Sequence, residues 1–138
     1  MRNLNSQRPG FTLIELLMVL TILGILAAIA VGKIGRTRER AHFKAMMSDL
    51  RNLQAQQEIY WAIPVNNYRY AGNVSLLSDF KTSGGVTVTI TTAANTGWAA
   101  TSSHAALTNT QTCAVFIGTV STVPSPAVSP GVVSCTGE

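Results

Sequence analysis

The sequence predicts an α+β protein in which one long N-terminal helix packs against a small antiparallel sheet. Three observations predict this fold. No proline interrupts residues 11–63, residues 86–92 alternate apolar side chains with threonine, and fifteen of the sixteen charged residues lie within residues 1–81. The chain has 138 residues, 46% of them hydrophobic, and its 11 glycines show no period of three. This length and composition indicate one folded domain and exclude a disordered or collagen-like chain.

Residues 11–32 form an apolar run that contains a single charge, Glu15. At about 1.5 Å per residue, a helix of this length covers roughly 33 Å, which matches the hydrocarbon core of a bilayer. A buried helix of a soluble protein would be shorter and would carry a polar stripe, which this run lacks. The run therefore predicts a membrane-spanning helix.

The segment ahead of the run, residues 1–10, is polar and carries Arg2 and Arg8. On these features alone, a secretory signal peptide and a plain signal anchor are both compatible with the N-terminus. Without the two arginines, the formal charge falls from +4 to +2, with eight basic and six acidic residues. A surplus this small argues against a dedicated nucleic-acid-binding protein.

Glu15 is the unusual residue of the apolar run. An ionised carboxylate in hydrocarbon costs about 2.5 to 3.5 kcal/mol on insertion scales, so it must lie near an interface or find a partner. No basic residue lies within one helical turn of it. We therefore expect the partner of Glu15 to come from another chain.

Residues 10–16 read G-F-T-L-I-E-L, which closely resembles the processing signature of type IV pilins. The resemblance implies that a prepilin peptidase removes the leader, residues 1–10, by cutting after Gly10 on the cytoplasmic side. It implies that the new N-terminal residue, Phe11, is then N-methylated. It also implies that the amine of one mature subunit neutralises Glu15 of its neighbour as subunits leave the membrane and form a filament.

Two glycines in the apolar run bear on the flexibility of the helix. Gly24 matches a glycine that is common in the family, whereas Gly32 stands where many members carry a proline. Each glycine costs about 1 kcal/mol relative to alanine inside a helix. Local melting between Gly24 and Gly32 is one interpretation, and close packing of helices at small residues is the other.

The basic residues around the run give conflicting indications of topology. Five follow it and two precede it, so the positive-inside tendency would place the C-terminal side in the cytoplasm. The family resemblance implies the reverse, and we follow it: one pass through the inner membrane, with the C-terminal head outside the cytoplasm before assembly and in an extracellular filament afterwards. The five residues are Lys33, Arg36, Arg38, Arg40 and Lys44. The arginines among them are interpreted as a solvated flank, with lipid headgroups, acidic neighbours or DNA as alternative contacts.

The helix is expected to continue past the membrane, because only Gly35 could break it before Pro64. Residues 36–64 show an amphipathic pattern with spacings of three and four. One face comprises Phe43, Met47, Leu50, Leu53, Gln57 and Tyr60, while Glu39, Ser48, Asp49, Asn52 and Gln56 fall largely elsewhere. The prediction is a single helix over residues 11–63 whose second half packs on a sheet.

The segment 65–80 is rich in Asn, Gly and Ser, which predicts a loop. A short helical or turn element is expected within it near residues 75–80. Tyr68 and Tyr70 are interpreted as anchors of this loop on the head, and nucleobase stacking beside Arg69 is the alternative.

The C-terminal part predicts the sheet. Residues 86–92 indicate a half-buried strand, and residues 98–105 and 113–120 indicate further strands. A three- or four-stranded antiparallel sheet on the helix follows, which with the resemblance gives a pilin-like head. The predicted segments are the leader (1–10), the hydrophobic transmembrane and polymerisation helix (11–35), its amphipathic continuation (36–64), and a head (65–138) with loop, sheet and closed C-terminal loop.

Cys113 and Cys135 are the only cysteines, and the topology adopted above places both outside the cytoplasm. A disulfide between them is therefore expected, and members of the family commonly tie their C-terminal loop in this way. Closing this segment of about 23 residues would constrain the unfolded chain by about 3.4 kcal/mol.

Catalytic and metal-binding patterns are weak. His42 and His104 are isolated in the sequence, and the head beyond Lys81 contains no carboxylate before the last residue. A nucleophilic triad lacks its orienting acid, and the cysteines and histidines lack the spacing of a zinc site. The prediction is a protein without enzymatic activity, metal or cofactor.

Two related classes of filament subunit share the N-terminal pattern. Major pseudopilins of type II secretion resemble pilins through the N-terminal helix, but typically hold their C-terminal loop with calcium, which requires several carboxylate and carbonyl oxygens. The 57 residues from 82 to 138 contain one acidic residue and two cysteines. These residues favour a disulfide-closed pilin.

The predicted function is that of a structural subunit of a type IV pilus, polymerising through its N-terminal helix into a surface filament for adhesion, twitching motility or DNA uptake. Expected partners are other copies of the chain, the prepilin peptidase, an inner-membrane assembly platform with cytoplasmic ATPases, and the bilayer before assembly; DNA binding stays open. The alternative is a minor pilin or a type II secretion pseudopilin. A second alternative is a monomeric membrane-tethered binding module, for instance for DNA.

Overall fold

The computed structural model describes residues 10–137, except for the side chains of residues 31–34. The chain divides into two compact units, with the boundary between Thr37 and Arg38. Helix α1 (Leu13–Ala62) contributes to both units. Its bounds lie within two residues of the predicted range, and the α+β fold class is confirmed. Residues 38–137 are called the head below.

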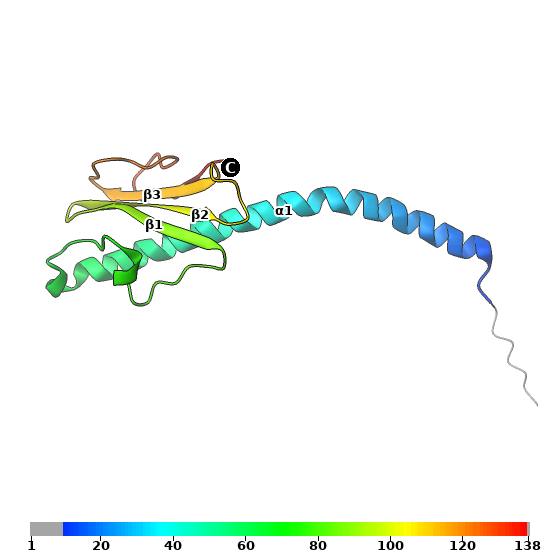
Figure 1. Ribbon diagram of the computed structural model, residues 1–138, viewed down its shortest axis with the longest axis horizontal. Coiled ribbons are helices and arrows are strands. Elements are labelled where there is room, and N and C mark those ends of the chain that lie inside the picture. Colours follow the sequence, from blue (N-terminus) through cyan, green and yellow to red (C-terminus); the bar gives the residue numbers. More distant parts are fainter. Residues whose placement is uncertain (1–9, 138) are drawn as a thin grey trace, which may run out of the picture. The chain divides into compact units, whose positions relative to one another are not determined.

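The head contains one four-stranded antiparallel sheet with the strand order β1-β2-β3-β4 (Figure 1). The strands are β1 (Val86–Ala93), β2 (Gly97–His104), β3 (Thr112–Gly118) and β4 (Ser134–Cys135). The first three are the predicted strands, with most bounds shifted by one residue. In β1, Val86 and Val88 are buried while Thr87 and Thr89 are exposed, so the half-buried strand is confirmed. The two residues of β4 are too few to give a sequence pattern.

Strand β3 ends at Gly118, two residues before the predicted end. The φ of Gly118 is +67°, and a Cβ there would lie 2.1 Å from the carbonyl oxygen of Thr96. Only glycine permits both this conformation and this close approach. The chain therefore leaves the sheet at this point and enters the C-terminal loop, residues 119–133.

Two short 3-10 turns, η1 (Pro64–Asn66) and η2 (Val74–Leu76), order the loop between α1 and β1. Pro64 stands at the start of η1, two residues after the end of α1, and a proline there cannot continue the helix. In η2, Asn73 Oδ1 accepts a hydrogen bond from the backbone N–H of Ser75 at 2.9 Å. The helical element predicted near residues 75–80 is thus one turn that begins slightly earlier.

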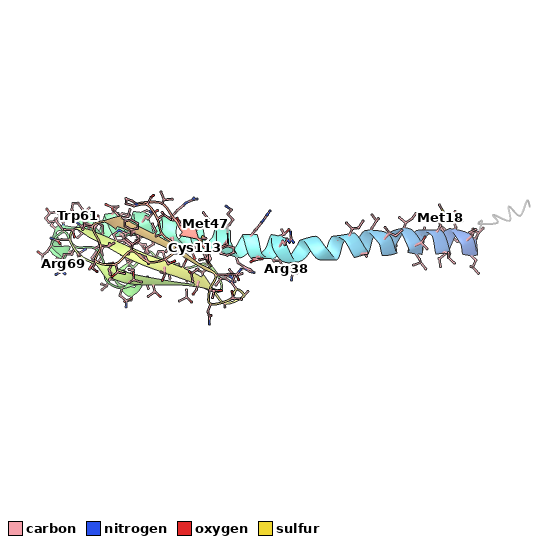
Figure 2. All side chains as sticks on the ribbon, turned by 90° about the horizontal axis from the view of Figure 1, so that it is seen from above. Met18, Arg38, Met47, Trp61, Arg69 and Cys113 are labelled. Carbon is pink, nitrogen blue, oxygen red and sulfur yellow. A yellow bond between two sulfur atoms is a disulfide. The ribbon has the colours of Figure 1, made fainter. Side chains whose placement is uncertain are left out.

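The core of the head lies between α1 and the sheet. Figure 1 shows the second half of α1 running along one face of the sheet, and Figure 2 shows Met47 and Cys113 close together at this contact. The buried helix residues are Phe43, Met46, Met47, Leu50 and Leu53, and their sheet partners in the core include Val88, Trp98, Cys113 and Val115. The predicted amphipathic face is confirmed, with Met46 as an addition.

Two buried polar residues of α1 hold the loop that precedes the sheet. Asp49 accepts hydrogen bonds from the backbone N–H of Ser83 at 2.7 Å and from its hydroxyl at 2.8 Å. The expectation that Asp49 falls outside the packed face is therefore wrong, because Asp49 is buried and faces the loop. Gln57 accepts from the N–H of Ala71 at 2.8 Å and donates to its carbonyl at 2.9 Å. Full pairing of this kind makes buried polar groups tolerable.

Candidate functional site

Glu15, the unusual charge of the apolar run, lies in the first turn of α1. Hydrogen bonds join it to Thr12, three residues earlier. Thr12 precedes the first helical residue, and its hydroxyl accepts a hydrogen bond from the backbone N–H of Glu15 at 3.3 Å. In return, Glu15 Oε2 accepts from the backbone N–H of Thr12 at 3.4 Å and from its hydroxyl at 3.2 Å. This is a capping box, in which a threonine and a glutamate three residues later satisfy helix-terminal groups reciprocally.

The capping box refines the interpretation of Glu15. Donors from its own chain satisfy one carboxylate oxygen, and a negative charge in the first turn is favoured by the helix dipole. Within residues 10–137, the other oxygen, Oε1, accepts no hydrogen bond. A cation from another chain can therefore bind Oε1 without disrupting the capping box. Thr12 is the site residue that sequence reasoning missed, although the pattern Thr-x-x-Glu before an apolar run signals it.

The predicted cleavage point lies directly before this arrangement. Gly10 and Phe11 are exposed and precede the helix, and 76% of the Phe11 surface is accessible. Exposed, non-helical backbone is the form that a peptidase needs at its substrate bond. The rest of the predicted leader, residues 1–9, lies outside the described residues. Cleavage after Gly10 and methylation of Phe11 therefore stay predictions.

The apolar run exposes its side chains along its whole described length. Every residue from 11 to 30 is exposed in the isolated chain, and Figure 2 shows the side chains around Met18 pointing outward from α1. By length and composition, α1 can cross a membrane. An apolar surface of this extent is characteristic of contact with lipid or with other proteins.

The two glycines of the apolar run are only partly described. Gly24 lies inside α1, and apart from its chain neighbours and the adjacent helix backbone nothing lies within 4 Å of a Cβ built on it. Gly32 belongs to residues 31–34, whose packing lies outside the described part of the chain. Melting of the helix between them during assembly stays a prediction.

The C-terminal loop is closed by the predicted disulfide between Cys113 and Cys135, which is present. The two cysteines face each other across β3 and β4, and Cys113 is fully buried. Gln54 of α1 adds a second tie, because its Nε2 donates to the carbonyl of Gly131 at 3.0 Å. The loop is thus fastened both to the sheet and to the helix.

The two histidines, which are isolated in the sequence, lie together in the head. The rings of His42 and His104 have centroids 3.9 Å apart, and His104 Nδ1 accepts a hydrogen bond from the N–H of Ala106 at 3.0 Å. In the described part of the chain, no three His, Cys, Asp or Glu residues gather into a metal-binding group.

Tyr68 and Tyr70 lie in the loop between α1 and β1. They contact the tryptophans of α1 and β2, as expected for residues that anchor this loop. The Tyr70 ring lies 6.2 Å from Trp61 and 6.4 Å from Trp98, and its hydroxyl donates to Glu58 Oε1 at 3.2 Å. Burial, with a further contribution from the charge and hydrogen bond of Glu58, raises the pKa of Tyr70. Tyr68 contacts Trp61 edge-on at 5.4 Å and stays about half exposed.

Comparisons with known proteins agree with the arrangement at the N-terminus. Residues 5–31 match the family model described as the prokaryotic N-terminal methylation motif. The chain is also similar to two proteins named type II secretion system core protein G: it is 33% identical to that of Dickeya chrysanthemi over 67 residues and 36% identical to that of Klebsiella pneumoniae over 65 residues. These matches cover 49% and 47% of this chain, but only 42% and 44% of the relatives. The resemblance to prepilin-type chains is confirmed.

Proposed function

We propose that the chain is a pilin-like subunit, which is anchored in a membrane by its N-terminal helix and then polymerises through that helix into a filament. Its expected partners are a prepilin peptidase, other copies of the chain and an assembly machinery in the inner membrane. The head remains outside the cytoplasm in this proposal. The relatives in secretion systems favour the pseudopilin class over a type IV pilus.

The capping box at Glu15 is the observation that supports this proposal most directly. It leaves Oε1 available at the start of an apolar helix whose side chains are exposed. After cleavage behind Gly10, the amine of Phe11 would be a cation at the same end of a neighbouring helix. A pairing of this amine with Oε1 would neutralise both charges before they enter an apolar filament core.

A type IV pilus subunit is the second candidate, and the disulfide favours it. Cys113 and Cys135 close the C-terminal loop, and the described head residues offer no cluster of three carboxylates for calcium. Deleting the gene separates the two candidates: a secretion subunit is required for export of proteins, whereas a pilus subunit is required for surface fibres.

The role of Glu15 can be tested with variants that separate its charge from its capping function. Glu15→Gln keeps a side chain that can complete the capping box but removes the charge, while Thr12→Ala does the reverse. We expect Glu15→Gln to lower the assembled fraction by roughly tenfold or more, which corresponds to about 1.4 kcal/mol or more per contact. Thr12→Ala should lower it much less. Sheared material and membranes are compared by quantitative immunoblot.

Wild-type filaments also provide the control for processing. The N-terminal mass of their subunits should be that of a chain that begins at N-methylated Phe11. Normal assembly of Glu15→Gln would contradict the charge pairing. Wild-type chains that begin at Met1 and never form multimers would contradict the proposed function as a whole.

A further inference from the structure

One end of the head carries an open groove with apolar walls. It is formed by the last two turns of α1 together with η1 and η2, and has a volume of about 290 Å³. Ile59 and Leu76 are 57% and 53% exposed there, and Ile63 is also exposed. The carboxylate of Asp79 is the one charge among the residues that line it. We call this feature the Asp79 groove.

The chemistry of the Asp79 groove fits a long basic side chain. Asp79 is exposed and has no hydrogen bond or ion pair with any residue in 10–137. A side chain that fits must place methylene groups on Ile59 and Leu76 and a positive charge against the carboxylate. Arginine does both, because its stem packs on apolar surfaces while its guanidinium binds a carboxylate through two parallel hydrogen bonds.

The head itself displays unpaired arginines of this kind. Arg40 and Arg51 are exposed on α1, and neither forms an ion pair with a described residue. The acidic residues on the same part of the helix accept hydrogen bonds from other residues: Glu39 from Gln111, Asp49 from Ser83 and Glu58 from Tyr70. The positive charge of these arginines is thus not compensated within the described head.

The groove and the arginines face different directions. Within one copy of the chain, the arginines therefore do not bind the Asp79 carboxylate. At 100° per residue, Arg51 lies roughly 80° from Ile59 around the helix axis. Two different patches that bind each other across copies form a heterologous contact. Such a contact repeats from copy to copy and generates an open assembly when the rotation does not close a ring.

We propose that the Asp79 groove binds Arg51 of a second copy of the chain, with the guanidinium on the Asp79 carboxylate and the stem between Ile59 and Leu76. This inference rests on the proposed function and adds a specific contact between heads. Arg51 is favoured over Arg40 by the offset along the helix. Pairing through Arg51 displaces the copies by about 15 Å, and pairing through Arg40 by about 32 Å, in a head whose helix is about 36 Å long. Only the smaller offset keeps much of the two heads in contact.

Thiol cross-linking of the full chain in assembled material tests the geometry. The native cysteines are paired and no other cysteine is present in the sequence, so a short bis-maleimide reacts only with introduced thiols. A chain with both Asp79→Cys and Arg51→Cys should give a ladder of covalent multimers. Each single variant, and the pair Asp79→Cys with Arg69→Cys, should give at least tenfold less product. A covalent dimer from Asp79→Cys alone in a yield similar to that of the double variant, or no ladder from the double variant in intact filaments, would overturn the inference.

Charge reversal tests the interaction itself. Asp79→Arg and Arg51→Glu should each lower the assembled fraction several-fold, and the double variant should recover most of it. Lys81→Glu, an exposed reversal two residues from Asp79, is the control and should assemble normally. Tryptophan fluorescence of each variant verifies that the head is folded.

The outcomes separate this inference from the proposed function. If wild-type chains form no multimers, the proposed function fails. If wild-type filaments form and the double reversal does not recover, the head contact alone is wrong. Loss of binding to anionic vesicles or to duplex DNA in Arg51→Glu, without recovery in the double reversal, would assign Arg51 to that ligand and would also overturn the contact.

Discussion

The two halves of helix α1 differ in what covers their apolar side chains. From residue 11 to residue 30 every side chain is exposed, whereas Leu50 and Leu53 in the second half are fully buried against the sheet. Both halves are helical and carry apolar side chains, so these side chains differ in what they pack against. The second half packs against the sheet of the same chain, and the exposed first half is suited to contact with lipid or with other proteins.

The polar residues of the two halves show the same difference. Within the head, both carboxylate oxygens of Asp49 accept hydrogen bonds, and the amide of Gln57 both donates and accepts one. Glu15 uses only Oε2, in the capping box. The carboxylate of Asp49 and the amide of Gln57 are therefore fully paired within the head, while the N-terminus retains an acceptor that another molecule can bind.

The largest expected effect comes from truncating one leucine in each half. Leu50→Ala should lower the free energy of unfolding of the head by about 3 to 5 kcal/mol, because a fully buried side chain leaves a cavity. Leu23→Ala, on the exposed half, should change it by less than about 0.5 kcal/mol. Urea unfolding of the full chain in detergent, followed by tryptophan fluorescence, measures both. Similar losses for the two variants would mean that the first half contributes to the stability of the head.

The disulfide gives the next largest effect and also belongs to the head alone. Replacing Cys113 and Cys135 together by alanine should lower the free energy of unfolding by about 3.4 kcal/mol through the larger entropy of the unfolded chain. A reducing agent should destabilise the wild type and leave the double variant unchanged. Unchanged urea midpoints after reduction of the bond would contradict this prediction.

Local patterns explain which parts of the fold could be predicted. The period of three and four identified the face of α1 that includes Leu50, and the alternation in residues 86–92 identified β1. Pairings across long sequence separations left no such signal. Asp49 is a buried polar residue of α1, and its partner Ser83 lies 34 residues away.

The candidate site was predictable to a similar degree. The motif at Gly10 to Leu16 identified the processing signature and Glu15, because a charge in an apolar run is conspicuous in any sequence. The Asp79 groove could not be predicted, since its walls come from the end of α1 and from two single turns that only the folded head brings together. The contact between the rings of His42 and His104 could not be predicted for the same reason.

The smallest expected effect concerns pH, and it separates the halves because only the head contains tyrosines. Burial first, and then Glu58, raise the pKa of Tyr70 above its ordinary value of 10.0. The folded head therefore holds this proton more tightly than the unfolded chain does. The resulting stability is fully present below pH 10 and is lost as the pH rises through the folded pKa. Unfolding by urea between pH 9 and pH 11 should show a steeper decline for the wild type than for Tyr70→Phe, and Glu58→Gln should lie between them. Parallel declines in all three would show that Tyr70 is not the group responsible.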